Sequence, residues 1–281
     1  MKRILSLLLC SLFLLAGCGE YNKAVKYGDP EYKYELAKAQ YARGKYTQAH
    51  DLLNSVVTSF KGSSYGEECL YLMGMSAFKG RDYDIASSTF KKYYQSYPRG
   101  LYVEEARYYS GLSLYENVAD PRLDQTTTYQ AIAELQSFLD YYPYTRLKEQ
   151  TQERIAQLQD HLVEKEYRSA KLYYDLGGYI GNATSGGSNY EACIVTAENA
   201  LRDYPYASAM RREQFMLLIL RSRYYLARQS VEEKRLDRFR QTIDEYYGFV
   251  NEFPESQYLK EAEGYFNKSK RALKGQALEE N

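Results

Sequence analysis

One spaced pattern of residues returns along most of this 281-residue chain. A glutamate is followed by a tyrosine, then a small residue, then an aromatic ring, three, six and ten residues later. The pattern starts at Glu31, Glu68 and Glu105, which are 37 residues apart, and it returns at Glu164. Self-similarity at a period of about 20–50 residues is typical of proteins built by stacking small units. The chain is therefore expected to form a repeat array.

Each unit is predicted to be a pair of helices. Apolar residues recur at spacings of three and four in both halves, which indicates amphipathic helices. Turns are expected at Gly44-Lys45 and at Gly80-Arg81-Asp82. An aromatic–proline pair such as Tyr97-Pro98 closes a unit, because proline stops a helix. The predicted fold is all-α: an α-solenoid of about five helix pairs, near residues 31–61, 64–98, 101–143, 146–205 and 208–254, with a capping helix at 255–274.

The N-terminus has the features of a secretory signal. Lys2 and Arg3 precede an almost wholly apolar run over residues 4–16, which is shorter than the about 20 residues that span a membrane. The run ends in Leu-Ala-Gly followed by Cys18, which resembles the bacterial lipoprotein signal. That resemblance implies cleavage before Cys18 and lipid attachment to it. An ordinary signal followed by an incidental cysteine is the alternative.

These features predict five segments. They are a signal peptide at 1–17, a lipid-anchored linker at 18–30, N-terminal repeats at 31–143, C-terminal repeats with the capping helix at 144–274, and a disordered tail at 275–281. Residues around 119–128 form an insertion in the third unit, and a Gly- and Ser-rich insertion follows at 181–189.

Composition argues against several functions. The 37 basic residues equal the 37 acidic ones, so a basic surface for nucleic acid is not expected. With only two histidines, His50 and His161, no metal site is predicted. No cofactor is predicted either. The sequence contains no recognisable catalytic motif, so the chain is not expected to be an enzyme. Cys69 and Cys193 lie among apolar helical residues and are expected to be buried free thiols rather than a disulfide.

Seven of the 33 tyrosines, together with Phe78, are expected to form two rows in the stacked repeats. The first row is Tyr34, Tyr71, Tyr108 and Tyr167, and the second row is Tyr41, Phe78, Tyr115 and Tyr174. A helix pair of this length, with fixed small positions and a terminal proline, resembles the tetratricopeptide repeat (TPR), whose first helices line a concave groove. The rings would then suit an extended peptide, and the alternative is that they pack between helices as core. The peptide-binding candidates are Glu31, Tyr34, Tyr41, Glu68, Tyr71, Phe78, Tyr108 and Tyr115.

Over about residues 25–270 the chain resembles the BamD family, also called ComL or YfiO, of outer-membrane barrel-assembly lipoproteins. The lipoprotein signal, the insertion in the third unit and the stretches at 166–174 and 201–205 carry this resemblance, and the many tyrosines suggest a Bacteroidetes-type member. It implies a non-enzymatic protein on the periplasmic face of the outer membrane, held by lipid on Cys18. Gly19, rather than aspartate, after the cysteine agrees with that location.

The resemblance also implies the partners. The C-terminal repeats would dock the periplasmic POTRA domains of a BamA-like barrel insertase, with Tyr167, Tyr174 and Arg221 as candidate contacts. The N-terminal groove would receive targeting strands of unfolded outer-membrane barrel proteins. Two alternatives remain: another periplasmic TPR adaptor, or a glycan-binding lipoprotein of a nutrient importer. The latter proteins are larger and usually bind sugar on tryptophan, which this chain lacks.

Overall fold

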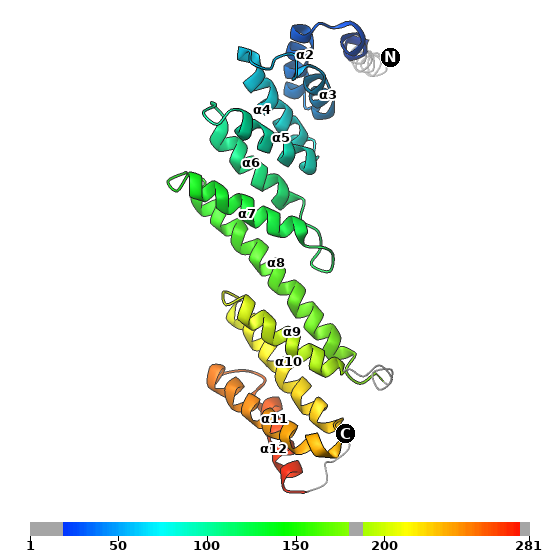
Figure 1. Ribbon diagram of the computed structural model, residues 1–281, viewed down its shortest axis with the longest axis vertical. Coiled ribbons are helices and arrows are strands. Elements are labelled where there is room, and N and C mark those ends of the chain that lie inside the picture. The colour runs from blue at the N-terminus through cyan, green and yellow to red at the C-terminus, as the bar shows by residue number, and fades with distance from the viewer. Residues whose placement is uncertain (1–18, 180–187, 276–281) are drawn as a thin grey trace, which may run out of the picture. The chain divides into compact units, whose positions relative to one another are not determined.

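The computed structural model describes residues 19–179 and 188–275, and these ranges contain helices and turns but no strand. The predicted all-α class is therefore confirmed (Figure 1). Residues 19–27 are helical, and the helices that follow are α2 (Pro30–Ala42), α3 (Tyr46–Val56), α4 (Ser64–Lys79), α5 (Tyr83–Ser96), α6 (Val103–Glu116), α7 (Thr126–Tyr141), α8 (Lys148–Asp175), α9 (Asn189–Asp203), α10 (Ala209–Arg228), α11 (Glu232–Glu252) and α12 (Leu259–Leu273).

The helices pair as a TPR-like solenoid requires. Helix α2 packs on α3, α4 on α5, α6 on α7 and α10 on α11, while α8 and α9 share an apolar core that includes Val163 and Cys193. The last described helix, α12, packs on both α10 and α11. The predicted arrangement of helix pairs followed by a final helix is confirmed.

The aromatic–proline pairs end the second helix of their units in one shared geometry. Tyr97, Tyr142, Tyr204 and Phe253 have φ between −122° and −127° and ψ of 65° or 66°. Proline clashes with a helical conformation at the residue before it, so each helix must stop at this aromatic residue. The local sequence therefore sets the end of each of these four helices.

The turns inside the first two repeats also correspond. Gly44 has a φ of +75°, and Arg81, which lies 37 residues later, has a φ of +63°. The sequence predicted this turn at Gly80-Arg81-Asp82, and within it Gly80 has a φ of −75°. The left-handed conformation falls on an arginine in the second repeat, where an L side chain adopts it at some cost.

The small residue of the repeated pattern allows the paired helices to approach each other. A Cβ added to Gly74 would lie 2.8 Å from the Phe90 ring, and one added to Gly111 would lie 2.7 Å from the Leu135 side chain. Ala37 occupies the corresponding position in the first repeat and is fully buried. In the second and third repeats a large side chain of the partner helix is therefore seated directly on this position.

The chain divides into two compact units that meet within α8, between Leu158 and Gln159. The sequence had suggested a division at 143/144. The reason for the difference is that α8 contributes to two cores: Ile155 and Leu158 pack with α6 and α7, whereas Val163 and Ala170 pack with α9 and α10. A single long helix therefore belongs to both units, and each unit is described separately below.

The segment expected to be a linker is partly ordered as well. Over residues 19–27 it is helical, Ala24 is fully buried, and the Tyr21 hydroxyl donates to Asp51 over 3.3 Å. The signal peptide, Cys18, residues 181–187 of the predicted insertion and the tail after Gly275 lie outside the described residues. Within the described residues, no helix is both long enough and apolar enough to cross a bilayer.

Candidate interaction surface

The first row of rings in the N-terminal unit lies mostly in the core. Tyr34 is 2% exposed and its ring is 5.6 Å from that of Phe60. Tyr108 is 5% exposed and 5.5 Å from Phe138. The core alternative therefore holds for Tyr34 and Tyr108, and their assignment to an open groove is wrong, because a peptide cannot reach a ring that the neighbouring helix covers.

Tyr71, in the same row, is only partly buried. Its ring stacks on that of Tyr102 with centroids 4.2 Å apart and lies 5.8 Å from Tyr93. Burial, and then the nearby Glu105 carboxylate, raise the pKa of Tyr71 above its ordinary range. The hydroxyl therefore stays protonated and remains a hydrogen-bond donor at the edge of the core.

The second row joins the two helices of a repeat. Tyr41 meets Tyr46 edge-on at 5.4 Å, and Phe78 meets Tyr83 in the same way at 5.7 Å, each pair being five residues apart. Both Tyr41 and Phe78 are half-buried. These rings hold the turn between the helices while one edge of each remains accessible.

In the N-terminal unit, the last two ring positions of the rows, Tyr108 and Tyr115, contact α8. The Tyr115 hydroxyl donates to Gln157 over 2.5 Å, and the Tyr108 hydroxyl is hydrogen-bonded to the amide group of Gln150 over 3.1 Å. The Arg154 guanidinium lies 5.9 Å from the Tyr108 ring and 5.6 Å from the Tyr115 ring. Tyr115 is therefore partly exposed but already bound to polar groups of α8.

The candidate glutamates lie beside these rings. Glu31 is exposed, in the first turn of α2, and Glu68 is partly buried, with its carboxylate 3.9 Å from the Lys38 ammonium. The structure thus leaves a reduced set of accessible candidates in the N-terminal unit. We call this set the α2–α6 edge: Glu31, Tyr41, Glu68, Tyr71, Phe78 and Tyr115.

In the C-terminal unit, the three docking candidates lie in two clusters. Tyr167 packs edge-on against Phe215 at 5.7 Å and carries the Arg211 guanidinium over its ring at 4.4 Å. Arg211 also pairs with Glu164, which accepts from Arg168 over 2.5 Å. This cluster joins α8 to α10 and leaves Tyr167 half-buried.

Tyr174 and Arg221 come together in the second cluster, with residues that the sequence did not single out. Arg221 donates two hydrogen bonds of 2.7 Å to Glu261, and the Tyr265 hydroxyl donates to the same carboxylate over 3.1 Å. Burial raises the pKa of Tyr174 to about 12, partly opposed by the charge of Arg221. The Tyr225 ring lies 6.4 Å from Tyr174 and 6.1 Å from Tyr265.

We call these five residues the Arg221 cluster: Tyr174, Arg221, Tyr225, Glu261 and Tyr265. They come from α8, α10 and α12. Arg221 and Glu261 are 40 positions apart, so no local periodicity relates them. Their pairing depends on the register in which the last helix packs on α10, which the sequence does not show. The charge of Arg221 is already matched, so a partner that uses Arg221 must share it with Glu261.

The remaining candidates have ordinary structural surroundings. Cys69 and Cys193 are buried free thiols, as expected, and burial raises the pKa of Cys193 to about 11. The partly exposed His50 has its Nδ1 atom 3.7 Å from Asp51. Among the residues that the structure describes, no group of three or more His, Cys, Asp or Glu is placed to hold a metal ion.

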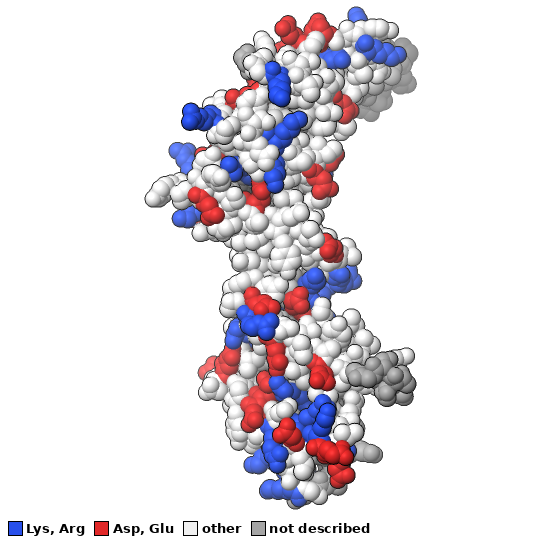
Figure 2. Space-filling model, viewed as in Figure 1, with Lys and Arg blue, Asp and Glu red and all other residues white. Residues whose placement is uncertain are grey.

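Charge is mixed over the face drawn in Figure 2, where Lys and Arg alternate with Asp and Glu on both units. Single rings protrude elsewhere: Tyr144 is 98% exposed and Tyr27 is 82% exposed. The repeated pattern does not include these tyrosines. Tyr144 lies in the turn between α7 and α8, and Tyr27 is the last residue of the helical segment 19–27.

Comparison with known proteins identifies the family of this chain. Residues 27–188, more than half of the chain, match the YfiO family, described as an outer membrane lipoprotein. The chain belongs to this family. The match includes the whole of the first three helix pairs and all of α8.

Three relatives are named outer membrane protein assembly factor BamD. That of Caulobacter vibrioides is 24% identical over 147 residues, 52% of this chain and 48% of the relative. The putative factor of Aquifex aeolicus is 30% identical over 177 residues, 62% of this chain and 58% of the relative. That of Pasteurella multocida is 25% identical over 181 residues, 61% of this chain and 69% of the relative. The match thus spans about half the length of the first two relatives.

Among solved structures, a thermophilic TPR protein of Thermus thermophilus is similar at 16% identity, covering 85% of this chain and all of the other, with a TM-score of 0.32. That score is too low to support a conclusion about the fold. The TPR-like assignment therefore rests on the helix pairs, the shared closing turns and the small contact residues described above.

Proposed function

We propose that this chain is a non-enzymatic lipoprotein of the outer-membrane barrel-assembly machinery. It acts as a helical scaffold that docks the barrel insertase and receives targeting strands of unfolded outer-membrane proteins. The observation that carries this proposal is the match of residues 27–188 to the YfiO family. The names of the relatives, which are assembly factors, support the same process.

The strand-binding role is assigned to the N-terminal repeats, residues 31–143. The α2–α6 edge offers partly exposed rings together with Glu31 and Glu68. Tyrosine provides apolar contact area and a hydroxyl with few rotatable bonds, which suits recognition of an extended aromatic peptide. Tyr34 and Tyr108 serve this surface indirectly, as the packing beneath it.

The docking role is assigned to the C-terminal repeats, residues 144–274, with Tyr167 and the Arg221 cluster as contacts. A bidentate Arg–carboxylate pair at a partly exposed site can hold a residue in one geometry, and arginine and tyrosine are enriched at the centres of protein interfaces. Lipid on Cys18 would hold the chain at the periplasmic face of the outer membrane. The POTRA domains of a BamA-like insertase are the proposed partner.

The partner assignment is tested by gentle detergent extraction of outer membranes, capture of the tagged chain and mass spectrometry. We expect a β-barrel protein with repeated periplasmic domains in near-stoichiometric amount. A Cys18→Ser variant should leave the membrane fraction if lipid is the anchor. Recovery of an importer barrel or a cell-wall enzyme without an insertase would contradict the proposal.

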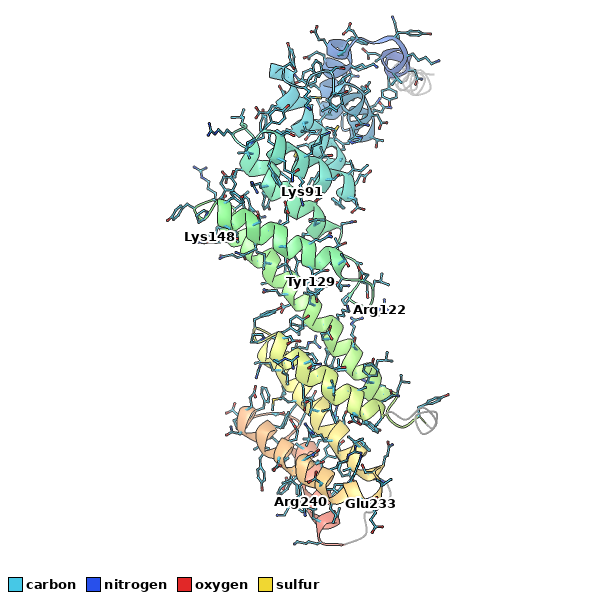
Figure 3. The ribbon with its side chains drawn as sticks, viewed as in Figure 1. Lys91, Arg122, Tyr129, Lys148, Glu233 and Arg240 are labelled. Carbon is cyan, nitrogen blue, oxygen red and sulfur yellow. The ribbon has the colours of Figure 1, made fainter. Side chains whose placement is uncertain are left out.

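The strand-binding surface is tested by replacing Tyr41 and Tyr115 with serine. Tyr129 is the matched control, a tyrosine of α7 outside both rows that is labelled in Figure 3. We expect the double variant to bind a peptide copied from the terminal strand of an outer-membrane barrel protein about tenfold more weakly, since each lost ring contact removes about 0.5–1 kcal/mol. The Tyr129→Ser variant should bind normally. Equal weakening in both, or loss of helicity together with binding, would contradict this surface.

A further inference from the structure

A pocket of about 450 Å³ lies between the first two repeats, apart from the α2–α6 edge. Its walls come from the end of α3, the turn into α4, the first turns of α4 and the second half of α5. The floor is apolar: Leu70 is 3% exposed and Val57 is partly buried. A pocket of about 300–1,000 Å³ with an apolar lining and a few polar groups is typical of binding sites.

Glycine shapes the floor of this pocket. A Cβ on Gly66 would clash with the Phe60 carbonyl oxygen and would lie 2.8 Å from the Tyr97 hydroxyl, so the first turn of α4 has no room for a side chain at this position. Gly62, in the turn before α4, has a φ of +84°, which L side chains rarely adopt. Both glycines line the pocket, and neither places a side chain in it.

The polar groups of the pocket have one charge sign. Lys61 and Lys92 line it together with the hydroxyls of Thr58, Ser96 and Tyr97, and no aspartate or glutamate is among the described residues of the lining. None of the ion pairs found in the described part of the chain involves either lysine. Both lysines are exposed, and with no acidic residue in the described lining the rim of the pocket is positively charged, which favours a ligand that carries a negative group.

An acidic side chain near this wall, Glu67, is already engaged. Glu67 contributes to raising the pKa of Tyr97, after the larger effect of burial. It does not line the pocket, and it accepts from the Tyr93 hydroxyl over 2.5 Å and from the Leu101 amide. The lysines are therefore left without an internal counter-charge at the pocket.

We propose that this pocket binds a protein segment that carries a carboxylate next to an apolar side chain. The apolar group would rest on Leu70 and Val57, and the carboxylate would lie between the Lys61 and Lys92 ammonium groups and accept from the rim hydroxyls. The chemistry follows from complementarity of charge and of apolar surface, and it does not depend on the proposed function of the chain.

The test uses the purified full-length chain in detergent and the peptide acetyl-Gly-Ser-Gly-Leu-Leu with a free carboxyl terminus. We expect saturable binding, and about two- to fivefold weaker binding in Lys61→Gln and in Lys92→Gln, the effect of one exposed charge pair. The double variant should lose about five- to twentyfold, as expected for independent contributions. The matched control is Lys91→Gln, which removes the same charge from the neighbouring position of α5, outside the pocket lining (Figure 3).

Two altered peptides test the two parts of the ligand. Amidation of the carboxyl terminus should weaken binding as much as the double variant does, and should add nothing further in that variant. Replacing the last leucine with serine should weaken binding to the native chain and to the double variant alike, because the floor is unchanged in both. If the double variant melts at a lower temperature, the charge-preserving Lys61→Arg/Lys92→Arg chain must retain binding.

Other results would overturn the proposal. These are no measurable binding of the free-carboxylate peptide, equal affinity for the amidated peptide, or an equal loss in Lys91→Gln. A further arm uses vesicles of phosphatidylglycerol. If the double variant loses vesicle binding but binds the peptide as the native chain does, the lysines recognise lipid headgroups and the assignment to a protein segment is wrong.

Discussion

At the scale of single residues, the glycines inside the helices differ in how closely a neighbouring side chain approaches them. Gly74 lies under the fully buried Phe90 ring, and Gly111 lies under Leu135. Gly264, inside α12, has no atom within 4 Å of an added Cβ. The first two are required by the contact between paired helices, whereas Gly264 only lowers the helix propensity of its segment.

We expect Gly74→Ala to destabilise the chain by about 1 kcal/mol. Overpacking against Phe90 costs about 1–3 kcal/mol, and the better helix propensity of alanine offsets about 1 kcal/mol of that. Gly264→Ala is the matched control and should stabilise the chain by about 0.5–1 kcal/mol. Urea unfolding followed by circular dichroism measures both, and a stabilising effect at Gly74 would contradict the close contact.

At the scale of elements, an ion pair helps to hold the last described helix in place. Helix α12 packs on α10 and α11, and Arg221 of α10 binds Glu261 in its first turn through two hydrogen bonds of 2.7 Å. The hydrogen bonds from Arg221, opposed by burial, hold the pKa of Glu261 below its ordinary value. The attachment of α12 should therefore depend on pH.

A carboxylate whose pKa is lowered by folding contributes stability above its ordinary pKa, about 4.3, and that contribution is lost as the pH falls below it. We expect Glu261→Gln to destabilise the chain by about 1 kcal/mol at neutral pH. The difference from the native chain should shrink below about pH 4. Thermal unfolding of both chains across that range measures it, and a difference that does not change with pH would contradict the ion pair.

At the scale of the whole molecule, tyrosine supplies much of the apolar packing in both units. Burial is the main cause that raises the pKa of Tyr34, Tyr71, Tyr93, Tyr94 and Tyr265 above the ordinary range, and of Tyr174 to about 12. A buried hydroxyl ionises with difficulty, since the phenolate loses its hydration. Both cores therefore depend on protonated tyrosine.

The chain should lose stability as the pH rises above about 10. The unfolded chain releases tyrosine protons near that pH, whereas the folded chain retains them, so unfolding becomes more favourable with each further rise. Urea unfolding between about pH 8 and pH 11 measures the loss, and ultraviolet absorbance should show a group of tyrosines that ionise only on unfolding. Tyr34→Phe should reduce the alkaline loss. Constant stability up to about pH 11 would contradict the buried-tyrosine core.

Much of the fold was predictable because its signals are local. The aromatic–proline pairs, the turn at Gly44 and the small residue at Gly74 each act on a few neighbouring residues, and the helix pairs follow from them. The division of the chain was not predictable in the same way. The boundary inside α8 depends on Ile155 and Val163 packing with different helices, which no local pattern shows.

The sequence alone determined that this chain is a helical repeat array, where its paired helices turn and stop, and which positions must stay small. Only the tertiary structure decided which rings of the two rows are accessible. Tyr34 and Tyr71 occupy the same position of the pattern, yet Tyr34 is buried and Tyr71 only partly so. The Arg221–Glu261 ion pair, too, is visible only in the tertiary structure. Periodicity is a property of one segment, whereas exposure and ion pairing depend on what a distant segment places opposite.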